Sequence, residues 1–315
     1  MGELPVGGFP VYYNIIRREY HIMAKITDGY IDFKGYKTYY RIVGEPGGGK
    51  LPLLALHGGP GCAHDYLESL DGIAEKYGRQ VIYYDQLGCG KSVVPGSHPD
   101  MWCAELWEEE IDVVRNALGL ENIHMLGQSW GGMLTMQYVI NKQPKGVNSI
   151  TIASSPASMD LWLSEANRLR GYLPENMQQA LKQADIDGDY SRPEVVEASA
   201  EYYRRHVCRI VPHPDFVDRS FDQMGEPYMV MQGASEFVVT GKMKDWDYSD
   251  RLDRINIPTL VTSGIDDEAT PAISKQIYDG VKDCRWELIP GTHLCHVEYP
   301  ELYNSIVEKF MEEHE

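Results

Sequence analysis

The chain has 315 residues, of which 43% are hydrophobic, and its formal net charge is −18 at pH 7. This length fits one large α/β domain with an insertion, or two ordinary domains, and we favour the first. The negative charge and the lack of a Lys/Arg cluster argue against nucleic acid and acidic membrane surfaces as partners, because binding to phosphates depends on concentrated positive charge.

The sequence also argues against a membrane anchor and a metal site. No stretch approaches the roughly 18 uninterrupted apolar residues that a membrane helix needs, and no charged segment with a long apolar run opens the chain. The six cysteines are scattered without a Cys-x-x-Cys pair, which favours reduced thiols. Cys284, Cys295 and the nearby histidines match no zinc spacing. We therefore expect a cytoplasmic protein without a metal, and the sequence indicates no oligomeric state.

In chain order, the first half predicts strands and then an alternation of strands and helices. Residues 30–33 and 38–42 flank Lys34-Gly35, which is typical of an antiparallel hairpin. Residues 51–56 and 81–84 are short apolar runs that lead into polar, glycine-rich loops, as buried central strands do. Apolar residues at steps of three and four predict an amphipathic helix over 105–118, with acidic residues in its early turns. A strand over 122–126, a sharp turn and a helix over 133–140 follow.

After a strand at 150–153 the pattern changes. Residues from about 158 to 240 are rich in Glu, Gln, Arg, Tyr and Met and have helical periodicity. Strand and helix alternate again from 258–262 through a helix at 272–281, a strand at 285–289 and a C-terminal helix at 301–312. We expect a mostly parallel sheet flanked by helices and divided into a first core part at 1–154, an inserted helical cap at 155–245 and a second core part at 246–315.

The candidate nucleophile is Ser129, within Gly127-Gln-Ser-Trp-Gly131. A serine hydroxyl is a weak nucleophile unless a base removes its proton and the backbone presents it without obstruction. Glycines two residues to either side let a strand and a helix approach closely, so that a strained turn exposes the serine above the sheet. The alternative interpretation is an ordinary glycine-rich βα turn, but the position between a predicted strand and helix indicates a serine hydrolase of the α/β-hydrolase fold.

A second motif, His57-Gly-Gly-Pro-Gly61, directly follows a predicted core strand. In a serine hydrolase such a loop supplies one main-chain donor to the oxyanion, and the residue after the nucleophile, Trp130, supplies the other. A phosphate-binding loop is the alternative. However, no Lys-Ser/Thr follows at P-loop spacing, and the Gly-x-Gly-x-x-Gly fingerprint is absent.

The order Ser, acid, His expected for this fold places the acid after the strand at 258–262 and the base after the strand ending at 289. The first loop offers Asp266, Asp267 and Glu268, and the second offers His293 and His296. Mechanism alone does not separate these neighbours, so both choices stay open at this point.

The motifs together resemble the proline iminopeptidase family, particularly its branch of tricorn-interacting aminopeptidases. The resemblance runs from about residue 25 to the C-terminus and rests on residues 57–61, 85–92, 127–132, 235–237, 244–247, 267–271 and 293–294. It implies Ser129 as nucleophile, Asp267 as acid and His293 as base, with the amides of Gly59 and Trp130 as the oxyanion hole.

The same resemblance implies that Glu236, from the cap, and Glu268, beside the triad acid, hold the substrate's free α-amine. Two carboxylates are a reasonable counter-charge for a buried cation. Glu236 also precedes an apolar, strand-like run. The departures from the family, Trp130 after the nucleophile and Cys295-His296-Val297 beside the base, affect the expected shape of the pocket and side-chain preference more than the reaction.

The implied function is a serine aminopeptidase that needs no cofactor and releases the N-terminal residue, proline or another often hydrophobic one, from short peptides. The expected partners are short peptides or amino-acid amides with a free N-terminus. One alternative is an amino-acid amide or ester hydrolase with the same triad. Another is a catalytically silent binding protein on the same fold, because fold alone does not establish activity.

Overall fold

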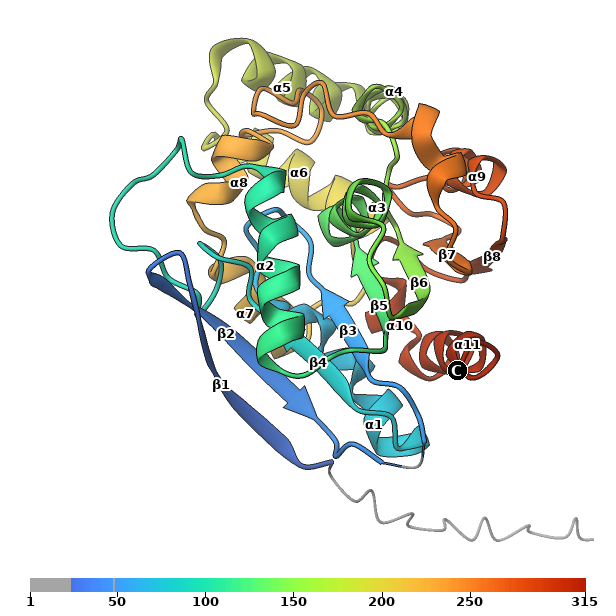
Figure 1. Cartoon of the computed structure of the whole chain (residues 1–315). Helices are drawn as coiled ribbons and strands as arrows, with labels where there is room; N and C mark the ends of the chain where they lie inside the picture. Colours follow the sequence, from blue (N-terminus) through green and yellow to red (C-terminus); the bar gives the residue numbers. More distant parts are fainter. Residues whose placement is uncertain (1–23, 48) are drawn as a thin grey trace, which may run out of the picture.

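The computed structural model describes residues 24–47 and 49–315, which form an eight-stranded sheet with helices on both faces (Figure 1). The strand order is β1-β2-β4-β3-β5-β6-β7-β8. Strands β1 (Ile26–Phe33) and β2 (Tyr36–Val43) form the expected antiparallel hairpin at one edge, and β2 is also antiparallel to β4. The neighbours from β4 to β8 pair in parallel.

The central strands are buried, except for Asn148 in β6, because apolar side chains point to both faces of the sheet. These strands are β3 (Leu53–Leu56), β4 (Val81–Tyr84), β5 (Ile123–Gln128), β6 (Val147–Ala153) and β7 (Thr259–Gly264). In β3, Leu54 and Leu56 belong to the core cluster on one face, whereas Leu53 and Ala55 belong to the cluster on the other. The edge strand β8 (Cys284–Ile289) is only partly buried.

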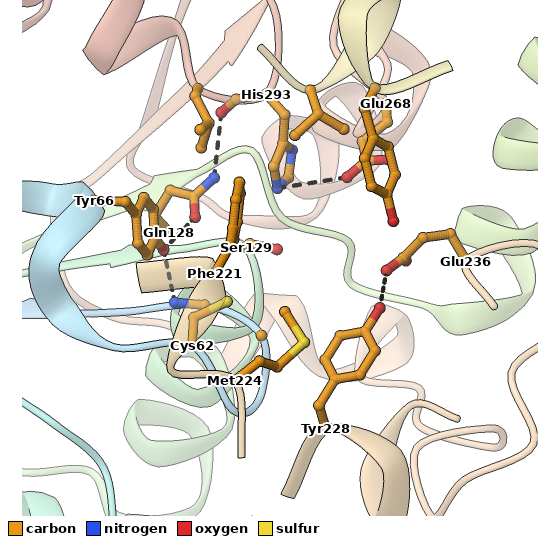
Figure 2. Close-up of a pocket in the computed structure, with 15 residues that line it drawn as sticks. Cys62, Tyr66, Gln128, Ser129, Phe221, Met224, Tyr228, Glu236, Glu268 and His293 are labelled. Carbon is orange, nitrogen blue, oxygen red and sulfur yellow. Dashed lines mark hydrogen bonds and ion pairs between the residues drawn. The ribbon is translucent and has the colours of Figure 1, made fainter. Parts of the chain in front are cut away.

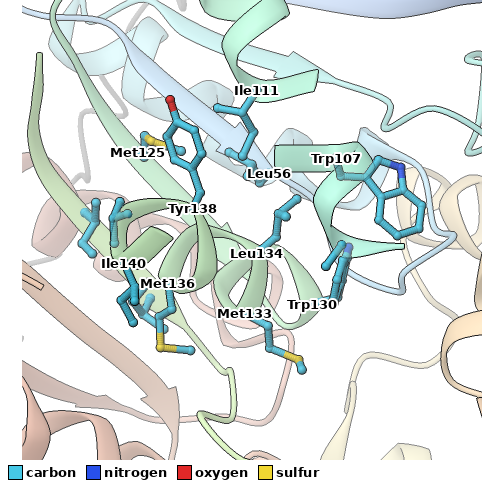
Figure 3. Packing of buried hydrophobic residues seen from close by; sticks show 14 of the residues in the cluster. Leu56, Trp107, Ile111, Met125, Trp130, Met133, Leu134, Met136, Tyr138 and Ile140 are labelled. Atoms are coloured by element: carbon cyan, nitrogen blue, oxygen red, sulfur yellow. The ribbon is translucent and has the colours of Figure 1, made fainter. Parts of the chain in front are cut away.

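Helices cover each face and create two separate cores. On one side α2 (Ala104–Ala117), α3 (Trp130–Lys142) and α9 (Pro271–Gly280) pack over the sheet. Figure 3 shows side chains of α3 meeting Leu56, Trp107 and Ile111 in this core. The other side holds the 3-10 helix η1 (His64–Leu70), α1 (Asp71–Tyr77), the short α10 (Cys295–Glu298) and α11 (Pro300–Glu312).

The helix at 104–117 differs from its sequence pattern in one respect. Two of the acidic residues that we expect in its early turns, Glu108 and Glu110, are buried rather than solvated. Glu110 accepts hydrogen bonds from the Leu87 amide at 3.0 and 3.1 Å and from the Thr38 hydroxyl. Burial raises the pKa of its carboxyl group to about 8. The residue therefore fixes the loop after β4 instead of facing water.

Between β6 and β7 the chain leaves the sheet and forms a group that we call the inserted helices. They are α4 (Met159–Arg170), α5 (Glu175–Asp187), α6 (Pro193–His206), α7 (Asp215–Asp222) and α8 (Glu226–Met231). Helices α4, α5 and α6 share a small core of their own, around Ala166, Leu181 and Tyr202. Figure 1 shows α4, α5, α6 and α8 beyond the carboxyl ends of the central strands, whereas α7 packs against η1. The boundaries at 155 and 245 stay a prediction. The second 3-10 helix, η2 (Ser249–Arg254), leads back to β7.

Two further findings concern the cysteines and the helices. All six cysteines are free thiols. Among residues 24–47 and 49–315, no helix has the length and apolar character required to cross a membrane.

Candidate active site

Ser129 occupies a strained turn between β5 and α3. Its backbone angles are φ 57° and ψ −125°, a region that residues with a side chain rarely adopt. The turn is held by its neighbours, because the Ser129 amide donates to the Ala153 carbonyl at 2.8 Å and the Ser155 hydroxyl donates to the Ser129 carbonyl at 2.8 Å. The side chain thereby reaches the carboxyl edge of the sheet, as the motif predicts.

The glycines around Ser129 are required by close backbone contacts. A Cβ atom on Gly127 would overlap the Gly131 carbonyl, and one on Gly131 would overlap the Leu56 carbonyl. A Cβ atom on Gly132 would overlap the Ser155 hydroxyl. We call the turn around Ser129 the elbow. No larger residue fits between the elbow, β3 and β6 without moving the backbone, so the pattern Gly-x-Ser-x-Gly-Gly follows from packing.

Asp267 and His293 meet beneath the cavity. His293 Nδ1 lies 2.8 Å from Asp267 Oδ1, and both side chains are buried. The Asp267 carboxylate also accepts from the Ala269 amide at 2.7 Å and the Gly264 amide at 3.1 Å. These contacts orient the carboxylate and leave Nε2 as the free nitrogen of the imidazole, on the cavity side.

The charges around His293 favour its protonated form. Burial lowers its pKa, but the carboxylates of Asp267, Glu268 and Glu236 outweigh this effect and raise the pKa to about 9. The Nε2 atom lies 3.8 Å from Glu268 Oε1. The imidazole is therefore strongly basic in the unliganded protein.

His296, the other candidate base, belongs to the core. Its Nδ1 lies 2.8 Å from the Ser69 hydroxyl, and its ring lies between those of Tyr66 and Tyr303, 5.7 Å from each. Burial, together with nearby His293, lowers its pKa to about 3. It therefore stays neutral, and it does not line the cavities described below.

The two candidate oxyanion donors lie on either side of Ser129. Trp130 is the first residue of α3, so no intrahelical carbonyl accepts from its amide. Gly59, in the loop after β3, has φ 114°. Gln86 joins the two segments: its side chain donates to the His57 carbonyl at 2.8 Å and accepts from the Trp130 indole at 2.9 Å.

Tyr66 and Gln128 form a second set of hydrogen bonds between the loops of the site, in addition to those of Gln86. The sequence patterns do not reveal it. The Tyr66 hydroxyl accepts from the Gly58 amide at 2.7 Å and donates to Gln128 Oε1 at 2.5 Å. Gln128 Nε2 donates to the His293 carbonyl at 3.2 Å. One tyrosine thus connects the loop that carries Gly59, the elbow and the loop that carries His293. Gln128 lies inside the motif, but nothing in the sequence around Tyr66 indicates this contact.

Glu268 and Glu236 face the same space from different parts of the chain (Figure 2). Glu268 is buried, and its Oε2 has no hydrogen-bond partner among the described residues. Burial, reinforced by Glu236 and Asp267 against the opposing charge of His293, raises its pKa to about 8. Glu236 accepts from the Tyr228 hydroxyl and, at 3.2 Å, from Gln232 Nε2. Burial also raises the pKa of Glu236.

The segment after Glu236 differs from the expectation. Residues 237–239 resemble a strand in sequence, but they form a bend that packs Phe237 against the inserted helices. An aromatic contact decides this conformation: the Phe237 ring lies edge-on to Tyr202, with 4.9 Å between centroids, and beneath the Arg170 guanidinium. Phe237 thus fills the local core of the inserted helices, Val239 joins the large core cluster and Val238 is exposed, and none of the three joins a sheet.

Two cavities meet at Ser129. The larger has a volume of about 250 Å³ and the smaller about 40 Å³. Four residues line both: Gly59, Ser129, Glu236 and Glu268. His293 lines only the larger and Trp130 only the smaller. Six of the seven predicted site residues thus border connected space, and Asp267 lies behind His293. Among the described residues there is no cluster of three or more His, Cys, Asp or Glu side chains that could hold a metal ion.

Comparison with known proteins agrees with this architecture. Residues 52–299 match the alpha/beta hydrolase fold family, so the chain is an α/β hydrolase. It is 43% identical over 290 residues to the proline iminopeptidase of Clostridium botulinum, which covers 91% of this chain and 98% of the relative. The corresponding protein of Clostridioides difficile is 44% identical over 290 residues, with the same coverage. The chain therefore belongs to the proline iminopeptidase family.

Solved structures show the same relationship. The proline iminopeptidase of Mycobacterium smegmatis superposes with a TM-score of 0.85 at 39% identity, over 91% of this chain and 98% of that one. The crystal structure of VinJ gives a TM-score of 0.88 at 38% identity, over 92% and 99%. These matches confirm the expected fold class and the family resemblance.

Proposed function

We propose that this protein is a serine aminopeptidase that releases the N-terminal residue, proline in particular, from short peptides through an acyl-enzyme. One observation supports this most strongly: Ser129 and an Asp267-held His293 border the same cavity as the buried carboxylate of Glu268 and the half-buried carboxylate of Glu236. The first pair suits acyl transfer, and the second pair suits a cationic amine. The names of the curated relatives favour this function over the alternative amide or ester hydrolase.

In the proposed acylation step, Ser129 Oγ attacks the carbonyl carbon of the first residue while His293 Nε2 takes the hydroxyl proton. The carbonyl oxygen becomes an oxyanion and accepts hydrogen bonds from the amides of Gly59 and Trp130. The C–N bond then breaks, His293 gives its proton to the leaving amine, and the first residue stays as an ester on Ser129. Asp267 holds the ring throughout and stabilises the imidazolium.

Deacylation repeats the cycle with water. His293 takes a proton from a water molecule, the resulting hydroxide attacks the ester carbonyl, and the proton returns to Ser129 Oγ as the free amino acid leaves. Every proton in both steps passes through side chains of this chain, so the proposal includes no cofactor.

The substrate's α-ammonium group would lie between Glu236 and Glu268. Glu268 Oε2 is buried without a partner among the described residues, and leaving such an acceptor unpaired costs free energy that a donor would recover. An acetylated amine lacks the positive charge and keeps at most one N–H donor for this site. The inserted helices act as a cap in this proposal, which restricts entry to short peptides. We place the enzyme in the cytoplasm, in keeping with its six free thiols.

The test compares prolyl, alanyl, leucyl and phenylalanyl aryl-amides, each with a free and an acetylated amine. Free-amine substrates should be hydrolysed and acetylated ones should not. Ser129→Ala should remove turnover, whereas Glu236→Gln and Glu268→Gln should raise KM for free-amine substrates. Equal turnover of free and acetylated substrates would instead indicate a general amidase or esterase. Full activity of Ser129→Ala would disprove the central assignment.

A further inference from the structure

The two cavities at Ser129 differ in their lining residues, and the position of the catalytic base indicates which part of a substrate enters each cavity. His293 borders only the larger cavity. Because the base that takes the proton from Ser129 must hand it to the departing nitrogen, the leaving group has to lie on the side of His293. The part of the substrate beyond the scissile bond therefore enters the larger cavity.

We propose that the enzyme selects its substrates by the group that follows the scissile bond, and that the larger cavity binds a bulky apolar residue or amine there through Phe221 and Met224. This inference rests on the proposed function. It goes further by naming a class of substrate: a small N-terminal residue joined to an aromatic or large aliphatic group that carries no nearby carboxylate.

The first support is the apolar lining of the cavity beyond the triad. Its outer walls consist mainly of aromatic and aliphatic side chains: Cys62, Tyr203, Val207, Phe221, Met224, Tyr228 and Leu294. The volume of about 250 Å³ suits a side chain of the size of Phe or Leu with part of the following backbone. Burying such a side chain removes apolar surface from water on both partners.

The second support is the distribution of charge. The ionised groups that can face this cavity are the carboxylates of Glu236 and Glu268 and the imidazole of His293. Neither Lys nor Arg is among the described residues that line it. A carboxylate on the leaving group would therefore meet two acidic side chains and neither Lys nor Arg among the described lining residues, and His293 is already paired with Asp267, which disfavours free dipeptides and acidic second residues.

The third support is the rigidity of the wall that carries Phe221. Helix α7 is fixed to the core, because the Ser220 hydroxyl donates to the Ala63 carbonyl at 2.8 Å and accepts from the Ala63 amide at 3.2 Å. Arg219 pairs with Asp65 at 3.0 Å and with Glu68 at 2.8 Å. A wall held in this way is already in place for the ligand, so binding loses less conformational entropy.

The mouth of the cavity explains how longer peptides are accommodated. Met224 is 39% exposed and Tyr203 is 43% exposed, so the side chains at this end border solvent. Methionine adapts its shape to different apolar partners. A peptide can thus place its second side chain against Phe221 and Met224 and continue outward.

The experiment keeps the first residue constant and varies the second. The measured quantity is kcat/KM, which reports the steps through acylation. The substrates are prolyl-glycinamide, prolyl-leucinamide, prolyl-phenylalaninamide, the α-amide of prolyl-aspartic acid with its side-chain carboxylate free, and the free dipeptide prolyl-phenylalanine. We expect kcat/KM for prolyl-phenylalaninamide to exceed that for prolyl-glycinamide by about 10- to 100-fold. The values of kcat/KM for the aspartyl amide and the free dipeptide should be lower than that for prolyl-phenylalaninamide by at least about tenfold.

The variants are Phe221→Ala and Met224→Ala, with Met229→Ala as matched control because Met229 is exposed and lies outside the lining. Each of the first two should reduce the ratio of kcat/KM for phenylalaninamide over glycinamide by about fivefold or more. Met229→Ala should keep the wild-type ratio. If Phe221→Ala does not fold, Met224→Ala carries the test.

The outcomes separate this inference from the proposed function. Equal kcat/KM for glycinamide and phenylalaninamide in the wild type would overturn the leaving-group inference while the aminopeptidase assignment stands. A reduced ratio in Met229→Ala equal to that in Phe221→Ala would also overturn it. Failure to cleave any prolyl substrate would instead contradict the proposed function.

Discussion

Asp185 accepts a hydrogen bond from the Ser235 hydroxyl at 2.8 Å, and this contact ties helix α5 to the residue that precedes Glu236. Asp185 is itself paired with Arg170 at 2.5 Å, and the Arg170 guanidinium lies 4.7 Å above the Phe237 ring. The residues on both sides of Glu236 are thus held by one buried ion pair. These contacts hold the segment that carries Glu236.

We predict that Ser235→Ala weakens recognition of the substrate amine. The hydroxyl also accepts from the Phe237 amide at 3.1 Å, so its loss frees both flanks of Glu236. KM for free-amine substrates should rise by about three- to tenfold with little change in kcat. Asp185→Asn should have a smaller effect, because the amide oxygen still accepts from Ser235. Both variants are tested by measuring KM and kcat for the hydrolysis of a prolyl aryl-amide.

The control for this prediction is Asp187→Ala, at the exposed end of the same helix, where the carboxylate pairs with Arg192. It should leave KM unchanged. A second measurement is the rate at which a fluorophosphonate, which carries no amine, acylates Ser129. If Ser235→Ala lowered this rate as much as it affects the free-amine substrates, Ser235 would support the whole fold and not the amine site.

A second prediction separates the two histidines. His293→Ala should lower kcat/KM by about 10⁴-fold or more, because base catalysis is lost. His296→Ala should instead lower the free energy of unfolding by about 1–3 kcal/mol, since it leaves a cavity and an unpaired Ser69 hydroxyl. Aryl-amide kinetics and urea unfolding distinguish the two. Catalytic loss in His296→Ala alone would reverse the assignment.

A third prediction concerns pH. The pKa of His293 is raised to about 9, so the fraction of unprotonated base, and with it acylation by a fluorophosphonate, should rise up to that region. In Glu268→Gln one charge that stabilises the imidazolium is gone, so the rise should move to lower pH. The reagent carries no amine, which keeps the result independent of amine binding. An unchanged profile would remove Glu268 as a cause of the raised pKa.

The same shift has a consequence for stability. The folded-state pKa of His293 lies above the unfolded value of about 6.5. Its protonation therefore stabilises the fold fully below about pH 6.5, and this contribution is lost as the pH rises through about 9. Replacing His293 by Ala should remove that part of the pH dependence of the unfolding free energy.

A fourth prediction tests the packing of the elbow. Gly131→Ala places a methyl group against the Leu56 and His57 carbonyls, so it should cost about 3 kcal/mol or more in unfolding free energy. Gly47→Ala is the control, since nothing lies within 4 Å of its added Cβ. Urea denaturation gives both values. A Gly131→Ala protein as stable as Gly47→Ala would mean that the backbone relaxes at no cost.

The strands along the chain and the position of the elbow could be predicted from the sequence because both depend on local patterns. Continuous apolar runs produce strands buried on two faces, and the glycines mark where the backbones of β3, β5 and β6 come too close for a side chain. Predicted and observed strands agree to within a few residues, and Val81–Tyr84 agrees at both ends.

The choice between neighbouring residues could not be predicted from the pattern, because consecutive side chains in a loop point in directions that only the backbone angles define. Asp266 is exposed and pairs with Arg209, Asp267 turns inward to His293, and Glu268 reaches the cavity. The contact of Tyr66 with Gln128 bridges residues 62 positions apart and leaves no periodic signal.

The two carboxylates of the proposed amine site come from separately packed parts of the protein: Glu236 is carried by the inserted segment, whereas Glu268 extends from the sheet. Recognition of a free N-terminus therefore requires both parts to be docked, while the nucleophile, its base and the oxyanion donors all belong to the sheet side. The inserted segment also holds the loops of Glu268 and His293, because the amides of both residues donate to the His206 carbonyl at the end of α6, at 3.2 and 3.0 Å. A change that loosens the inserted helices should therefore disturb the position of His293 as well as the amine site.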